Sequence, residues 1–194
     1  MPSGEDHLRV PYAAMEAVIA GLHSIGDDQA SALRARLKYF QRIGLPAERP
    51  KQGRRTGYPV EDVLQVVLAF ELLACGVAPL RAARAARTNW AFNKGAFAKA
   101  ARGERAFLSM HPRALLELVD AARSVGDPIA DPFGKLASED VAEWAQGEFA
   151  QRNAGAERSI LLIDLTRLIT AASPLLVANG VDAEGFRATV AAMR

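Results

Sequence analysis

An apolar segment that follows Pro59 constrains the fold of this chain most. Large apolar residues recur there at helical intervals, at Val60, Val63, Leu64, Val67, Leu68 and Leu72. Pro59 suits the first turn of a helix, Glu61 and Asp62 suit its positive end, and Gly76 stops it. The segment is shorter than the ~20 residues that cross a membrane. We therefore expect a buried helix in a soluble protein.

The composition extends this expectation to the whole chain. The protein has 194 residues, enough for one large domain or two small ones, and half of them are hydrophobic. Alanine makes up much of the apolar share, and it favours helices while adding little core volume. We predict a mainly α fold with minor β structure.

In the first half of the chain, helical spacing predicts two helices before the buried one. Residues 1–11 are expected to be a flexible N-terminus. A helix is predicted over Tyr12–Leu22, and a turn at residues 26–28 offers an Asp N-cap to a helix over Gln29–Ile43. That second helix carries one apolar stripe and one basic stripe. Residues 47–58 are expected to form two extended arms around a turn, and a short helix is expected to run from Pro79 to Arg87.

The second half mixes helices and strands. Strands are predicted at Phe107–Met110 and Ile160–Ile163. We expect them to pair with each other and with a second subunit, or to be covered by the surrounding helices. Residues 126–134 are expected to be a loop. Helices are expected at Pro112–Val125, from Ser138 to Arg152, from Thr166 with an interruption near Pro174, and from Ala183.

Charge is distributed unevenly along the sequence. Residues 31–60 contain eight basic residues and one acid, and residues 81–105 contain seven basic residues and one acid. Residues 127–150 reverse the sign, with six acids and one lysine. Such a basic region attracts polyanions, chiefly nucleic acid, although solvated helix faces also show this pattern.

Three segments in fixed order carry a more specific signal. Residues 36–46 read RLKYFQRIGLP, residues 53–58 read GRRTGY, and residues 73–80 read LACGVAPL. The first resembles the end of the recognition helix in the bacterial MerR family, the second resembles that family's basic wing, and the third resembles the junction into its last short helix. The acidic start of the buried helix also falls in its expected place.

The resemblance implies an N-terminal winged helix-turn-helix DNA-binding domain over residues 12–87. It also implies a sequence-specific transcriptional regulator that grips and distorts promoter DNA, works as a homodimer, and meets RNA polymerase. A helix with basic outer positions fits the major groove, and a basic loop can contact phosphate. The predicted DNA-binding residues are Arg34, Arg36, Lys38, Tyr39, Arg42, Arg49, Lys51, Arg54, Arg55 and Tyr58.

The sequence departs from the family after the wing. Pro59 stands where the family has an arginine, and residues 88–103 lack the heptads of its coiled-coil helix. Residues 88–194 are therefore predicted to be a small mixed α/β module that dimerises or regulates.

No enzyme, cofactor or metal is expected. Cys75 is the sole cysteine and is expected to pack as a small hydrophobic residue, and the three histidines lack the spacing of metal ligands. Asp164 ends a predicted strand, where it is more often a helix cap than a catalytic group. The N-terminus lacks the pattern of a secretion signal, so we expect a cytoplasmic, nucleoid-associated protein.

Two alternatives remain open at this point. Excisionase-like architectural or recombination accessory proteins use a similar winged fold. The basic face could equally serve a protein-interaction module with an acidic partner, including the chain's own acidic segment.

Overall fold

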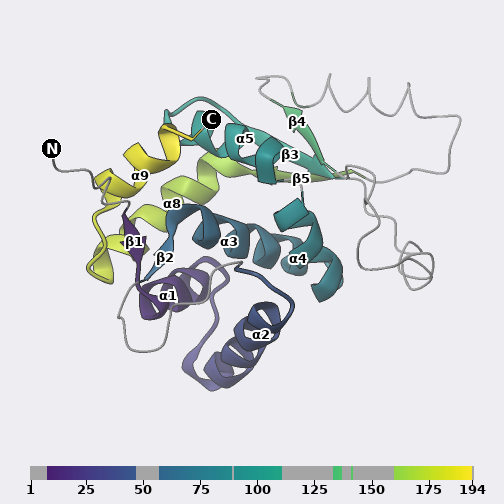
Figure 1. Ribbon diagram of the computed structural model, residues 1–194, viewed down its shortest axis with the longest axis vertical. Coiled ribbons are helices and arrows are strands. Elements are labelled where there is room, and N and C mark those ends of the chain that lie inside the picture. Colours follow the sequence, from purple (N-terminus) through teal and green to yellow (C-terminus); the bar gives the residue numbers. More distant parts are fainter. Residues whose placement is uncertain are drawn as a thin grey trace, which may run out of the picture.

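The computed structural model is mainly helical and describes residues 8–46, 57–88, 90–110, 133–136, 141 and 160–193 (Figure 1). Within these residues there are seven α-helices and two small sheets. The elements are β1 (Arg9–Val10), α1 (Tyr12–Leu22), the 3-10 turn η1 (Asp27–Gln29), α2 (Ala30–Arg42), β2 (Tyr58–Pro59), α3 (Val60–Ala74), α4 (Pro79–Thr88), α5 (Trp90–Ala101), β3 (Phe107–Met110), β4 (Phe133–Leu136), β5 (Leu161–Asp164), α8 (Leu165–Ala178) and α9 (Ala183–Ala191).

Helix α3 is the buried helix that the sequence predicts. Eleven of its fifteen residues are buried, including Leu68 and Leu72, which are fully enclosed. It starts directly after Pro59 and ends before Gly76, whose φ of 82° suits a residue without a side chain. Helices α1, α4 and α9 all pack against it, so α3 organises the core.

The start of the chain is tied to the segment before α3. Arg9 and Val10 fall in the stretch expected to be flexible, yet they form β1 and pair antiparallel with β2. Val10 is fully buried, and Arg9 Nη1 donates a hydrogen bond of 2.8 Å to the Gly57 carbonyl. A Cβ at Gly57 would collide with the Val10 carbonyl oxygen, which explains why glycine stands there.

Helices α1 and α2 follow the predicted pattern closely. The bounds of α1 are the predicted ones, and α2 begins and ends one residue inside its predicted range. The expected Asp cap of α2 is wrong: residues 27–29 form η1, Gln29 occupies the N-cap, and no side chain caps α2. Both aspartates lie within this 3-10 turn, so neither occupies the N-cap position of α2.

The second half contains an antiparallel sheet in the order β4-β3-β5. The predicted pairing of the strands at 107–110 and 160–163 is confirmed, with β5 shifted by one residue to end at Asp164. Asp164 is the N-cap of α8 and accepts a hydrogen bond of 3.0 Å from the Arg167 amide. The structural role expected for this aspartate is thus the one observed.

Four expectations for this half and its junction fail. Helix α5 occupies a stretch with no predicted element, and β4 includes residues 133 and 134 of the expected loop. Helix α8 continues through Pro174 without interruption.

Cys75 is exposed rather than packed, because it follows the last turn of α3. Partial burial and then the charge of Glu71 raise the pKa of its thiol. The helices predicted over 112–125 and 138–152 lie outside the described residues, apart from the helical residue 141.

One hydrophobic core crosses the predicted domain boundary at residue 87. Helix α1 packs against α8, and α3 contacts α9. At Gly21 of α1 the contact is so close that a Cβ would lie 2.6 Å from Leu175 Cδ2 of α8. The buried cluster accordingly includes residues of both halves. No helix in the described part of the chain is long and apolar enough to cross a membrane.

Candidate nucleic-acid interface

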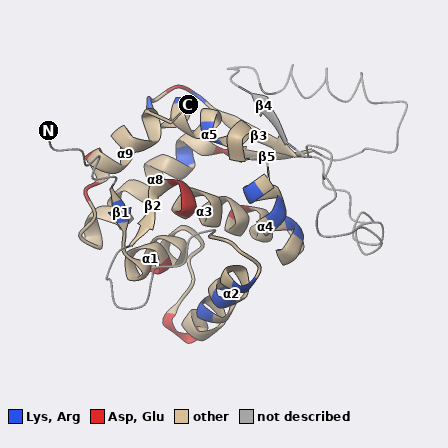
Figure 2. Ribbon diagram, viewed as in Figure 1, with Lys and Arg blue, Asp and Glu red and all other residues tan. Residues whose placement is uncertain are grey.

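Helix α2 has two sharply different faces. Leu33, Leu37 and Phe40 are buried, and the Phe40 ring meets the Phe70 ring of α3 edge-on, with centroids 5.4 Å apart. The opposite face is exposed and carries basic residues. Figure 2 shows Lys and Arg positions along α2, which lies at one end of the molecule. The apolar stripe fixes which way the cations point.

Three predicted cations, Arg36, Lys38 and Arg42, lie on the exposed side of α2. Tyr39 is half-buried between two of them: the guanidinium carbons of Arg36 and Arg42 lie 6.0 and 5.8 Å from its ring centroid. At this distance a guanidinium group is attracted to the face of the ring. Within the residues that the structure describes, no carboxylate pairs with any of the three cations.

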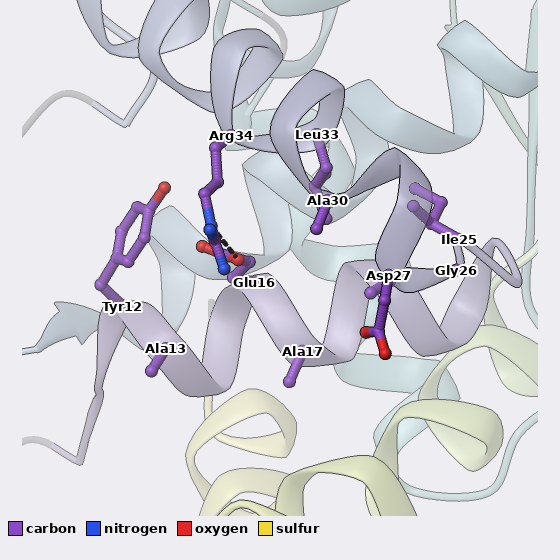
Figure 3. Close-up of a pocket in the computed structure, with 11 residues that line it drawn as sticks. Tyr12, Ala13, Glu16, Ala17, Ile25, Gly26, Asp27, Ala30, Leu33 and Arg34 are labelled. Carbon is purple, nitrogen blue, oxygen red and sulfur yellow. Dashed lines mark hydrogen bonds and ion pairs between the residues drawn. The ribbon is translucent and has the colours of Figure 1, made fainter.

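Arg34 differs from its neighbours because it is paired. Its Nε donates a hydrogen bond of 2.8 Å to Glu16 Oε1 on α1. The pair lies in a groove of about 400 Å³ between α1, η1 and α2, where Figure 3 shows Arg34 reaching back toward α1. Arg34 is thus placed on the flank of α2 rather than on its outer face.

The structure places Tyr58 in the core rather than at the surface. It is 3% exposed, and its hydroxyl accepts a hydrogen bond of 2.9 Å from Gln41 Nε2. Burial raises the pKa of this hydroxyl most, the Gln41 hydrogen bond lowers it, and Asp62 raises it. The side chain joins β2 to α2, and this buried position does not fit the predicted contact with DNA at the surface.

The remaining predicted residues, Arg49, Lys51, Arg54 and Arg55, lie outside the described residues. The described residues on either side of this segment are held in place by the fold. At one end Gly44, with a φ of 83°, terminates α2 and Leu45 is buried; at the other, Gly57 and β2 are held against β1.

Helix α4 adds cations that the site prediction missed. Arg84 and Arg87 stand three residues apart on an alanine-rich helix whose alanines are mostly buried. Arg87 Nη1 donates a 3.2 Å hydrogen bond to the Gly44 carbonyl, which brings this cation to the C-terminal end of α2. Figure 2 shows the basic residues of α2 and α4 at neighbouring positions. The arginines within residues 81–87 are spaced three apart, which places them on one side of a helix, and this spacing could have predicted the additional cations.

The interface is not uniformly basic. Asp27 and Asp28 are exposed in η1, directly before the N-terminus of α2, and Glu16 lies on its flank. The unpaired positive charge therefore concentrates on the C-terminal half of α2 and on α4. This set of Arg36, Lys38, Arg42, Arg84 and Arg87 is called the basic face below.

The described residues offer no other site of comparable chemistry. They hold no group of three or more His, Cys, Asp or Glu side chains that could bind a metal ion. His23 Nε2 lies 3.6 Å from Glu71 Oε1, too far for a hydrogen bond, and His7 and His111 fall outside the described part. Comparisons of the chain with protein-family models, curated proteins and solved structures gave no match.

Proposed function

We propose that this protein binds double-stranded DNA through the basic face, together with the loop between α2 and β2. The observation that carries the proposal is the set of exposed cations Arg36, Lys38 and Arg42 on α2, which no carboxylate neutralises in the part of the chain that the structure describes. Phosphate oxygens are the natural partners of such donors, and arginine in particular binds phosphate through two parallel hydrogen bonds.

The arrangement of the elements supports this partner. Helix α1, the turn at η1 and α2 follow one another in the order that a helix-turn-helix requires, and the predicted basic wing comes next in the sequence. An α-helix fits the major groove of DNA, and a flanking loop can contact the backbone on either side. Because the net charge of the chain is only +2, attraction to DNA depends on the separation of charge and not on the total.

The resemblance of the sequence to MerR proteins refines the proposal. On that basis the protein acts as a transcriptional regulator that distorts promoter DNA and binds as a homodimer whose second half supplies the dimer contacts. Transcription from a reporter that carries the binding site would distinguish a regulator from an architectural protein.

The direct test is fluorescence anisotropy with labelled random genomic duplexes over a series of salt concentrations. Each phosphate neutralised contributes about −0.9 to the slope of log affinity against log salt. The basic face predicts a slope of about −3 or steeper. No binding at low salt would contradict the proposal and would turn attention to acidic proteins as partners of this face.

A further inference from the structure

We propose that Glu16 is a positioning residue that holds Arg34 beside Tyr12, so that these two side chains bind one DNA phosphate. This inference rests on the proposed function and adds to it a second contact point, on the flank of α2. It concerns the groove between α1 and α2, which the basic face does not include.

The geometry of the ion pair leaves Arg34 able to bind a second anion. Glu16 accepts from Nε, so both terminal amino groups of the guanidinium remain available as donors. The Arg34 side chain is 60% exposed, whereas the Glu16 side chain is only 17% exposed. The carboxylate is thus the sheltered half of the pair, and the guanidinium is the half that faces solvent.

Glu16 is well placed to fix the guanidinium because α1 is a firmly packed helix. Met15, Val18 and Ile19 are essentially inaccessible to solvent, and Gly21 is in close contact with α8. An arginine side chain loses considerable rotamer freedom when it is immobilised. Holding it in place before DNA arrives lowers the entropic cost of the phosphate contact.

Tyr12 supplies the neighbouring donor. Figure 3 shows its hydroxyl beside Arg34 at the same end of the groove, whereas Asp27 lies at the opposite end. Burial raises the pKa of the Tyr12 hydroxyl most, the charge of Glu16 comes next, and a hydrogen bond to Glu16 raises it least. The hydroxyl therefore keeps its proton, and to bind a phosphate it must rotate so that this proton points to the phosphate instead of to Glu16. The Tyr12 ring also lies near the Tyr58 ring, with centroids 6.5 Å apart, so this end of the groove adjoins the anchored end of the loop.

The test depends on the direction in which duplex affinity changes when Glu16 is removed. Removing an acid from a DNA-binding surface ordinarily strengthens binding. Glu16→Ala is instead expected to weaken duplex affinity about threefold to tenfold, because Arg34 loses its support. Glu16→Gln retains an oxygen that accepts from Nε and is expected to stay within about twofold of the wild type.

Two further variants make the result specific. Asp27→Ala removes an acid from the other end of the same groove and should leave affinity unchanged or raise it. Arg34→Ala should reduce the magnitude of the salt slope by about 1, and Glu16→Ala should have no weakening effect in that background. Thermal unfolding of each variant checks that the fold is retained.

The outcomes separate the two proposals. Stronger or unchanged binding by Glu16→Ala, with wild-type binding intact, would overturn the role of Glu16 and leave the proposed function standing. The role of Glu16 would also be overturned if Glu16→Gln weakened binding as much as Glu16→Ala does. No salt-dependent binding by the wild type would overturn both.

Discussion

Helices α2 and α3 are of similar length but are stabilised in opposite ways. Helix α3 buries eleven of fifteen residues and is enclosed by its neighbours, whereas α2 buries three of thirteen and lies at one end of the molecule (Figure 1). Each large apolar side chain that is fully buried contributes about 1.5–3 kcal/mol. A narrow stripe is therefore enough to hold α2 in place, and the rest of its surface is free to carry charge.

The largest expected effect is on the free energy of unfolding. It tests whether a substitution in the apolar stripe of α2 destabilises the protein as much as one in the buried helix α3. Phe40→Ala should lower the free energy of unfolding by about 3–5 kcal/mol, and Leu68→Ala of α3 by about 2–5 kcal/mol. Lys38→Ala, on the outer face of α2, should change it by less than about 0.5 kcal/mol. Urea denaturation followed by circular dichroism measures all three. A loss below about 1 kcal/mol for Phe40→Ala would mean that α2 is not anchored through Phe70.

A smaller effect is expected where the chain passes from the loop after α2 into α3. Gly57→Ala places a Cβ against the backbone of Val10, which must move. We expect a loss of about 2 kcal/mol, measured as above. Gly103→Ala is the matched control: its φ is 84° but the space around it is open, so about 1 kcal/mol of backbone strain is expected. If Gly57→Ala were the milder change, β1 would not hold the loop as described.

The smallest effect concerns the partly exposed end of α3, where Glu71 lies near His23, the C-cap residue of α1. Burial raises the pKa of Glu71 from its usual 4.5, and His23 lowers it to a lesser extent. The folded state thus binds a proton more readily than the unfolded state, and stability falls as pH rises through the interval above 4.5. The cost is fully present near pH 8, well above this interval.

Glu71→Gln removes that cost. We expect it to raise the free energy of unfolding at pH 8 by up to about 1 kcal/mol, with the difference from wild type shrinking toward pH 4. Thermal melts at the two pH values provide the measurement. Destabilisation at pH 8 would show that contacts of the Glu71 carboxylate outweigh its burial.

The sequence predicted those parts of the fold that depend on local pattern. The bounds of α1 and the burial of α3 follow from helical spacing of apolar residues, and β3 and β5 follow from short apolar runs. The sequence did not predict helix α5. Most of its alanines are buried and Gly95 interrupts them, so the helix has no clear apolar face opposite a polar one. Strands β1 and β4 owe their existence to distant partners, which local propensity does not encode.

The residues of the candidate site also divide into those that local pattern predicts and those that depend on distant partners. The outward direction of Lys38 and Arg42 could be predicted, because Leu33, Leu37 and Phe40 define the opposite face. The partner of Arg34 could not, since Glu16 is 18 residues away and meets it only across two packed helices. For Tyr58, both a surface and a core position were compatible with the sequence, and only its hydrogen bond to Gln41 decides between them.

The central claim is that the position of the cations, and not their number, creates the DNA-binding surface. The most direct measurement compares duplex binding by Lys38→Ala/Arg42→Ala with binding by Lys99→Ala/Arg167→Ala, which removes the same charge from exposed sites on α5 and α8. The first pair should weaken binding strongly and reduce the magnitude of the salt slope by about 2, whereas the second pair should leave the slope nearly unchanged. Equal losses in the two variants would contradict the claim, because any attraction to DNA would then follow the total charge.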